Sequence, residues 1–167
     1  MNYLPNNLYR KILDNAPVLC VDIYIYNRNL KKFLLVRRNN EPEKNKYCCT
    51  GGRVFKGEDL FNAAVRKVKE ELGVKIKKND LCFFGITSTF FKNSAFDNVS
   101  SHTVNASFIY IVDDLNKFHI KLSNESSDFE WKHGNENNVV KFVSKTINKI
   151  NSVEFKTKAI YLNFEQK

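Results

Sequence analysis

The chain has 167 residues, a net charge of +9 at pH 7, and 43% hydrophobic and 13% aromatic residues. This composition excludes an intrinsically disordered chain, and the length is typical of one domain with a buried core. We therefore predict a single domain over residues 1–167. The surplus of Lys and Arg favours anionic partners such as nucleotides or nucleic acid, without choosing among them.

The cysteines give no sign of a metal site or of a disulfide framework. None belongs to a C-x-x-C pair, and they stand at Cys20, Cys48, Cys49 and Cys82. No secretory signal follows Met1, and no long apolar stretch could cross a membrane. We expect a reduced, cytoplasmic protein without a membrane anchor.

The first half of the chain predicts a short helix and three strands. Helical spacing of apolar residues runs over Pro5–Asn15. β-Branched and aromatic residues then favour strands at Val18–Tyr26 and Lys32–Arg38, which a turn at residues 27–29 would join as a hairpin. After a polar loop, Tyr47–Thr50 predicts a third strand that leads into two glycines.

The second half alternates helices and strands. Apolar residues recur at every fourth position over Glu58–Leu72, which predicts an amphipathic helix closed by Gly73. The remaining elements that we expect are strands at Leu81–Phe91, His102–Val112 and near Asp128–Trp131, a helix at Asn138–Ile150, and a helix or strand at Val153–Leu162. This order of elements predicts an α/β or α+β sandwich.

Two adjacent acidic residues near the end of the central helix are the first sign of chemistry. Glu70 and Glu71 repel each other and oppose the helix dipole, because both lie close to its C-terminal end. A divalent cation between the helix and the preceding loop would relieve both costs, and Mg²⁺ suits one or two carboxylates plus a substrate phosphate. Gly51 and Gly52 in that loop allow the backbone to approach closely and to offer a carbonyl oxygen.

The spacing around this pair resembles the Nudix box, G-x5-E-x7-R-E-U-x-E-E-x-G-U, in which U is an aliphatic residue. The matching positions are Gly52, Glu58, Arg66, Val68, Glu70, Glu71, Gly73 and Val74. The resemblance implies a Nudix α/β/α sandwich with a mixed sheet, and Mg²⁺ or Mn²⁺ as cofactor. It also implies that Glu70 and Glu71 bind the metal, while Glu58 and Arg66 support the geometry of the loop and helix.

One position departs from the box, because Lys67 stands where the box has Glu. A protonated lysine cannot bind a metal, but this one can reach Glu70 and Glu71 as i,i+3 and i,i+4 neighbours. It would replace the charge of one metal ion. We therefore expect fewer bound ions than in an enzyme with the full box, namely one.

Beyond the box, three stretches resemble the GDP-mannose mannosyl hydrolase branch of the family, at Pro17–Asp22, Phe33–Arg38 and Gly51–Lys56. On this resemblance Arg38 and Arg53 contact the diphosphate of the nucleotide, which agrees with the bidentate binding of phosphate by guanidinium groups. The resemblance also makes the Gly51 carbonyl a metal ligand and Asp22 an active-site residue. Because Asp22 is costly to bury unpaired, we predict Arg38 or Arg53 as its partner.

A late segment, Asn124–Trp131, resembles another part of that branch. Glu125 then aligns with a metal ligand, and Ser126 stands where the branch has a His that acts as general base. A serine hydroxyl is a poor base at neutral pH, so Glu125 or His102 would have to serve. That branch attacks the sugar carbon and most Nudix enzymes attack phosphorus, and the sequence leaves both routes open. Thr103 stands where the branch has a Tyr.

We predict a metal-dependent hydrolase of a nucleoside diphosphate derivative, with a nucleotide sugar such as GDP-mannose as the first candidate. The residues expected to serve in catalysis are Glu70, Glu71, Glu125 and Arg53, with substrate contacts from Arg38, Arg53, Asp22 and His102. One alternative is a Nudix pyrophosphatase acting on NTPs, ADP-ribose or a capped RNA end. Another is a nucleotide-binding module without catalysis, which Lys67 and Ser126 would favour. The resemblance further implies a homodimer, and a nucleic-acid partner is less favoured because basic and aromatic residues do not interleave.

Overall fold

A mixed sheet of seven strands organises the molecule, and the computed structural model describes residues 4–152. The strand order is β3-β2-β1-β6-β5, while β4 pairs with β1 and β7 pairs with β2. The pairing of β1 with β6 is parallel and the other pairings are antiparallel. The elements in chain order are α1 (Asn6–Asn15), β1 (Val18–Asn27), β2 (Lys32–Arg38), β3 (Tyr47–Cys48), β4 (Thr50–Arg53), α2 (Leu60–Leu72), η1 (Lys78–Asp80), β5 (Leu81–Phe91), β6 (Ser101–Val112), η2 (Leu115–Lys117), β7 (Ser126–Lys132) and α3 (Lys141–Ser152).

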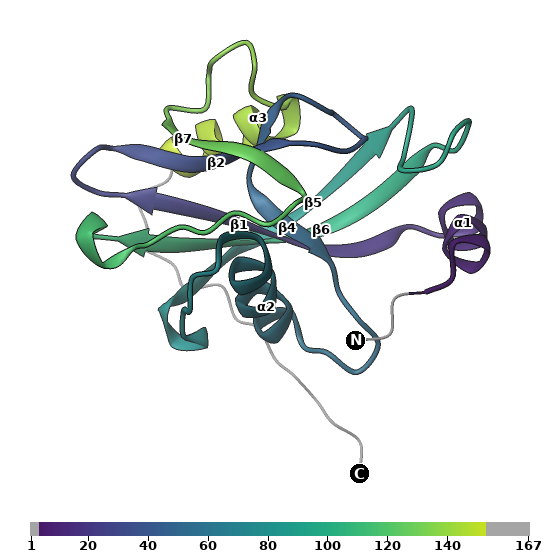
Figure 1. Ribbon diagram of the computed structural model, residues 1–167, viewed down its shortest axis with the longest axis horizontal. Helices are drawn as coiled ribbons and strands as arrows, with labels where there is room; N and C mark the ends of the chain where they lie inside the picture. Colours follow the sequence, from purple (N-terminus) through teal and green to yellow (C-terminus); the bar gives the residue numbers. More distant parts are fainter. Residues whose placement is uncertain (1–3, 153–167) are drawn as a thin grey trace.

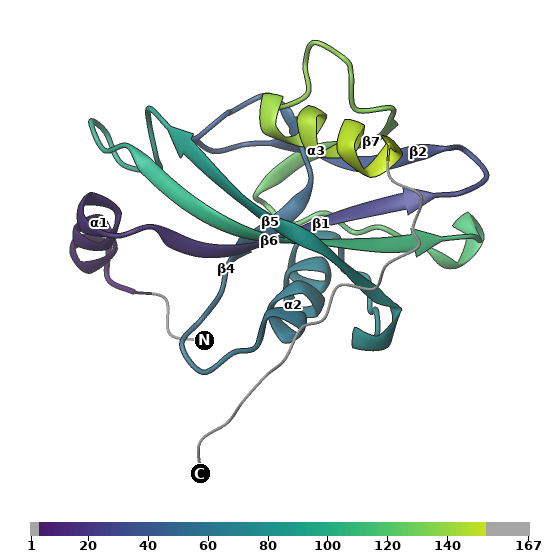
Figure 2. The same ribbon diagram turned by 180° about the vertical axis from the view of Figure 1, so that it is seen from behind.

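The two longer helices cover opposite faces of the sheet (Figures 1 and 2). One core cluster joins α2 to the sheet through buried residues such as Val21, Ala64 and Phe108. A second cluster joins α3 to the other face through residues such as Tyr24 and Ile147. Helix α1 lies apart from both, at the end of the sheet where β1 begins (Figure 1). Within residues 4–152, no helix combines the length and the apolar character needed to cross a membrane.

Strand β1 changes partner along its length, and this opens the sheet. Its residues 25–27 pair with β2, whereas residues 20–23 pair with β4. Strand β2 meanwhile pairs with β3 and β7. The sheet therefore forks at the middle of β1, with β4 on one branch and β2, β3 and β7 on the other.

Helix α2 begins and ends at residues that its sequence explains. The Asp59 side chain caps the helix by accepting a hydrogen bond from the backbone N–H of Asn62, at 2.8 Å. Gly73 closes it in the left-handed conformation, with φ at 69°. The predicted start at Glu58 was two residues early, because Asp59 takes the capping position and Glu58 binds another residue described below.

The predicted sandwich and the predicted hairpin of β1 and β2 are confirmed. One expected strand, Tyr47–Thr50, is in fact two, because the chain leaves β2 after Cys48 and continues through both glycines to Arg53 alongside β1. All four cysteines are free. The helix or strand expected at Val153–Leu162 lies outside the described residues.

Candidate active site

The two glycines of β4 allow the backbone to pass where no side chain would fit. A Cβ atom on Gly51 would collide with the carbonyl oxygen of Val21 on the neighbouring strand. Gly52 has φ of 148°, and a Cβ atom there would lie 2.9 Å from Cε of Lys67. The pair thus places β4 against β1 on one side and admits the lysine side chain on the other.

Arg66 fastens the loop before α2 to the end of that helix. Its guanidinium donates to both carboxylate oxygens of Glu58, at 2.7 and 2.8 Å, and to Glu70 at 3.0 Å. It also donates to the backbone carbonyl of Arg53, at 2.9 Å. The Glu58 carboxylate in turn accepts from the backbone N–H of Phe55, at 3.1 Å. These contacts agree with the supporting role that the resemblance gave to Glu58 and Arg66.

Three carboxylates converge on the ammonium group of Lys67. Its Nζ lies 2.8 Å from Glu71 Oε1 and 3.6 Å from carboxylate oxygens of both Glu70 and Glu125. Lys67 and Glu71 are buried, whereas the side chain of Glu125 is largely exposed. The second oxygen of Glu71 accepts a hydrogen bond from the backbone N–H of Gly51, at 3.4 Å. The residues that the sequence predicted as metal ligands therefore lie close together, and the ammonium group of Lys67 lies between them.

Burial and charge act in opposite directions on this cluster. Burial raises the pKa of the Glu71 carboxyl to about 7, although the ammonium group of Lys67 and the N–H of Gly51 favour its ionised form. Burial alone would lower the pKa of Lys67, but Glu71, Glu125 and Glu70 together outweigh it and raise that pKa. The lysine thus stays charged and stabilises negative charge around it.

The donor set of this cluster suits one hard cation. Glu70 Oε1 is buried and has no hydrogen-bond partner among residues 4–152, so it has a lone pair to offer. The same part of the chain has no group of three or more His, Cys, Asp or Glu side chains arranged as a complete metal site. Mg²⁺ is commonly held by one or two carboxylates together with a substrate phosphate, and the residues fit that mode rather than a closed protein cage.

A cavity of about 300 Å³ opens in the fork of the sheet, beside these carboxylates. Its lining includes Gly51 and Gly52 of β4 and Glu71 of α2, and also Asp22 of β1 and Asn105 of β6. Helix α1 and the loops before β3, β6 and β7 complete it. The cavity therefore joins the carboxylate cluster to a polar wall of the central strands.

Asp22 is buried in that wall, and its partner differs from the one we predicted. Its Oδ2 accepts a hydrogen bond from the Asn105 side-chain N–H at 2.8 Å, where we had predicted Arg38 or Arg53 as its partner. Asn105 is within reach because the parallel pairing of β1 with β6 places it on the same face of the sheet as Asp22. Burial raises the pKa of Asp22 to about 6, while Asn105 and the charge of Arg38 act in the opposite direction.

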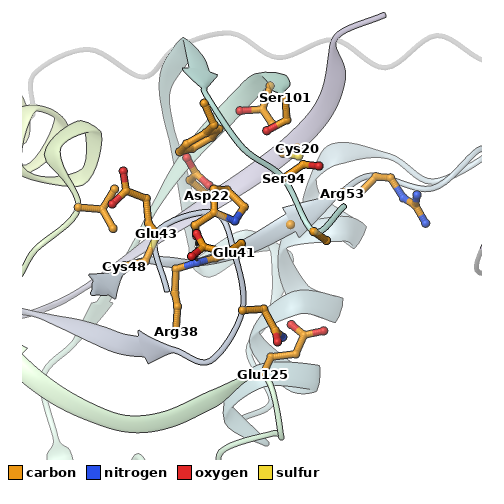
Figure 3. Close-up of a pocket in the computed structure, with 18 of the residues that line it drawn as sticks. Cys20, Asp22, Arg38, Glu41, Glu43, Cys48, Arg53, Ser94, Ser101 and Glu125 are labelled. Atoms are coloured by element: carbon orange, nitrogen blue, oxygen red, sulfur yellow. Dashed lines mark hydrogen bonds between the residues drawn. The ribbon is translucent and has the colours of Figure 1, made fainter. Parts of the chain in front are cut away.

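The two predicted phosphate-binding arginines lie differently. Arg38 lines the cavity, and its Nε donates to the backbone carbonyl of Pro42 at 2.8 Å, which ties the loop before β3 to β2. Arg53 also lies at the cavity wall, but its side chain points away from Asp22 (Figure 3). Its guanidinium carbon lies 4.5 Å above the ring of Tyr9 in α1.

The late segment and the expected histidine separate in the structure. Glu125 and Ser126 line the cavity, and Figure 3 shows Glu125 at its edge near α2. His102 is not among the described lining residues, because it alternates with Ser101 and Thr103 and faces the other side of the sheet. Its ring stacks on Phe90, with the centroids 4.2 Å apart. Its proposed contact with substrate stays a prediction without support from this geometry.

Sequence reasoning missed Asn105, gave Thr103 no role, and missed Tyr9. A signal for the first two was present, because Thr103, Asn105 and Ser107 alternate with apolar residues over the stretch 103–108 of β6. Such alternation in a central strand marks a polar patch inside the protein. Tyr9 gave no comparable signal, since its contact depends on how α1 packs.

Comparison with known proteins agrees with this arrangement. The family model of the NUDIX domain matches residues 16–145. A relative from Haloferax volcanii, named low-salt glycan biosynthesis protein Agl8, is 32% identical over 114 residues, which cover 68% of this chain and 70% of that protein. An ADP-ribose pyrophosphatase from Methanocaldococcus jannaschii is 40% identical over 65 residues, or 39% of this chain and only 37% of its own length.

The fold has the same relatives. A C. elegans Ap4A hydrolase, solved as a binary complex, superposes with a TM-score of 0.60 at 20% identity, covering 81% of this chain and 96% of that one. That identity supports a shared fold and no more. With the box on β4 and α2, the matching domain model and the shared architecture, the chain belongs to the Nudix family.

Proposed function

We propose that this Nudix hydrolase cleaves a nucleoside diphosphate linked to the anomeric carbon of a sugar, and that the cavity in the forked sheet is its active site. The observation that carries the proposal is that one cavity joins two kinds of wall. The carboxylates around Lys67 suit a cation and a diphosphate, whereas Asp22 and Asn105 suit a neutral group that donates hydrogen bonds. A nucleotide sugar such as GDP-mannose carries both kinds of group.

The cation would be one Mg²⁺ or Mn²⁺ ion, because Nudix hydrolases generally use a divalent metal. Its protein ligands would come from Glu70 and Glu71, together with the Gly51 carbonyl, and Glu125 would be a further ligand only when it does not serve as the base. Three carboxylates and the ammonium group of Lys67 leave two negative charges when all are ionised, which one divalent ion balances. When bound, the ion would neutralise the diphosphate and stabilise the charge on the leaving phosphate.

The protein's own residues would do the rest. Arg38 would hold the diphosphate from the β2 side of the cavity, where its side chain already lies. Arg53 would join it by leaving the ring of Tyr9, which costs a modest cation–π contact. Lys67 would keep Glu71 ionised near neutral pH by lowering its pKa relative to the value that burial alone would set.

The water that attacks the substrate needs a base, and Glu125 is the candidate that the geometry favours. Its carboxylate lies at the edge of the cavity and keeps contact with solvent, whereas His102 faces away from the cavity. Ser126 also lines the cavity, but a serine hydroxyl is a poor base at neutral pH. Attack at the sugar carbon and attack at phosphorus both remain compatible with this placement.

The test is a substrate panel in Mg²⁺ that includes nucleotide sugars, ADP-ribose, NTPs and capped RNA. We expect the highest kcat/KM with a nucleotide sugar, measured by release of free sugar or of phosphate esters. Reaction in ¹⁸O-labelled water separates the routes, because label in the sugar means attack at carbon and label in a phosphate means attack at phosphorus. Preference for ADP-ribose or NTPs would refute the proposed substrate class.

A pyrophosphatase acting on ADP-ribose is the second candidate, and the M. jannaschii relative gives it specific support. The matched region of that relative is short, so the support is local. A nucleotide-binding module without turnover is the third candidate, and tight binding of the panel without product in Mg²⁺ or Mn²⁺ would establish it. The homodimer, the cytoplasmic location and the single domain stay predictions.

A further inference from the structure

Asn105 holds its side-chain amide in a fixed orientation. It lies on β6, is only 5% exposed, and donates its side-chain N–H to Asp22 Oδ2 at 2.8 Å. Because a carboxylate accepts hydrogen bonds, this contact keeps the amide nitrogen toward Asp22 and turns the carbonyl oxygen away from it. That oxygen, Oδ1, is buried and has no hydrogen-bond partner among residues 4–152.

A second buried polar atom without a hydrogen-bond partner lies two residues away on the same strand. Thr103 is two residues before Asn105, on the same face of β6, and both residues line the cavity. Its Oγ1 is also buried without a hydrogen-bond partner in the described part of the chain. Buried polar atoms are almost always satisfied in native proteins, so two of them in one cavity wall point to a ligand that satisfies them.

The chemistry of this wall excludes the phosphates. Asn105 Oδ1 and the Asp22 carboxylate are both acceptors, so they repel phosphate oxygens and require a donor. A hydroxyl group can donate to Oδ1 and also exchange a hydrogen bond with the Thr103 hydroxyl. The wall is also close to the carboxylate cluster, since Asp22 pairs in register with Gly51.

We propose that Asn105 is a specificity-determining residue for the proposed reaction, whose carbonyl oxygen accepts a hydrogen bond from a hydroxyl of the sugar attached to the diphosphate. The hydroxyl of Thr103, two residues earlier on the same face of β6, forms a second hydrogen bond with that sugar hydroxyl. The inference rests on the proposed function, which supplies the sugar. The enzyme thus selects among sugars by the position of one hydroxyl, which donates a hydrogen bond to the neutral amide of Asn105.

Calorimetry in Mg²⁺ with GDP and with an analogue of GDP-mannose that is not hydrolysed tests this assignment directly. We expect Asn105→Ala to weaken binding of the analogue about 10-fold, the equivalent of one hydrogen bond, and to leave GDP binding unchanged. An equal loss for GDP would overturn the proposal, because the wall would then contact the nucleoside. Thr103→Val should also lower the affinity for the analogue, whereas the matched control Thr89→Val should not. Thr89 pairs across the strands with Thr103 and has an equally buried, unpartnered hydroxyl, but it does not line the cavity.

A second measurement does not depend on how well the Asn105 variant folds. Among monodeoxy forms of the same analogue, one should bind about 10-fold more weakly than the parent to the unaltered protein, and that difference should vanish in Asn105→Ala. Equal affinities for all analogues would overturn the inference. Binding with the expected pattern but without turnover refutes only the proposed hydrolysis. Turnover with unchanged affinity in Asn105→Ala refutes only the role of Asn105.

Discussion

Replacing Lys67 by Met should destabilise the protein far more than the loss of a surface lysine would. The lysine is buried, with its Nζ 2.8 Å from Glu71 and 3.6 Å from Glu70. Removing one partner of a buried ion pair typically costs about 3–5 kcal/mol, because the other charge stays buried and uncompensated. For a domain of this size the thermal midpoint moves roughly 2–4 °C for each kcal/mol, so we expect a fall of about 6–20 °C.

The loss of stability on Lys67→Met should depend on pH, because the Glu71 carboxylate can be protonated and so lose its charge. Burial raises the pKa of Glu71 from 4.5 to about 7 in the folded protein. A carboxyl with a raised folded pKa disfavours folding as pH rises from its unfolded pKa through its folded pKa. At pH 5.5 Glu71 is mostly protonated, so little charge is left for Lys67 to compensate. At pH 8 Glu71 is ionised, and its buried charge depends on Lys67. The loss on Lys67→Met should therefore be about 1–2 kcal/mol smaller at pH 5.5 than at pH 8.

Urea unfolding at the two pH values, without divalent metal, measures both effects. Lys69→Met is the matched control, because Lys69 lies on the exposed side of the same helix. We expect the control to change the free energy of unfolding by less than about 0.5 kcal/mol. A small loss for Lys67→Met, or the same loss at both pH values, would refute the reasoning on the buried cluster.

Three further changes test other parts of the site. Asp22→Asn should raise the free energy of unfolding by up to about 3 kcal/mol at pH 8 and by little at pH 4. Burial raises the Asp22 pKa from 3.8 to about 6, so the costly charged form is present in the folded protein only at higher pH. Urea unfolding that shows no gain at pH 8 would contradict this. Glu71→Gln should lower metal-dependent kcat at least about 100-fold with an unchanged circular dichroism spectrum, and undiminished turnover would remove Glu71 from the metal site. Gly52→Ala should lower the free energy of unfolding by about 1–3 kcal/mol and displace Lys67, because φ is 148° at this position and the new Cβ meets the lysine side chain. Gly57→Ala is the control, because Gly57 has φ of 80° but open space around it. An equal loss in both variants would show that backbone strain alone is responsible.

Local patterns predicted most of the elements. Strand Leu81–Phe91 was predicted to the residue, and α2 was displaced only at its start. In these segments the spacing of apolar residues decides which face is buried, and the capping residues decide where the element ends. The spacing of the box likewise predicted that Lys67 lies beside Glu70 and Glu71.

What the sequence did not predict depends on contacts between distant segments. The change of partner from β2 to β1 that divides β3 from β4 is set by long-range hydrogen bonds, which no local pattern reports. The partner of Asp22 was wrong for the same reason. An arginine is the usual expectation for a buried carboxylate, but the register of β1 against β6 brought Asn105 within hydrogen-bond distance.

Lys67→Glu, which restores the residue of the full box, gives the most direct test of why this chain departs from it. With Lys67, the carboxylates of Glu70, Glu71 and Glu125 are left with two uncompensated negative charges, enough for one divalent ion. The substitution removes the ammonium and adds a fourth carboxylate, so the cluster should require two ions. Equilibrium dialysis with Mn²⁺ and a nonhydrolysed nucleotide should then give about one ion per chain for the native protein and about two for the variant. The variant should also unfold more easily than the native protein without metal and gain more from its addition, because like charges are then packed together. One ion in both proteins would mean that Lys67 does not stand in for a metal, and its packing against Gly52 would then be its main role.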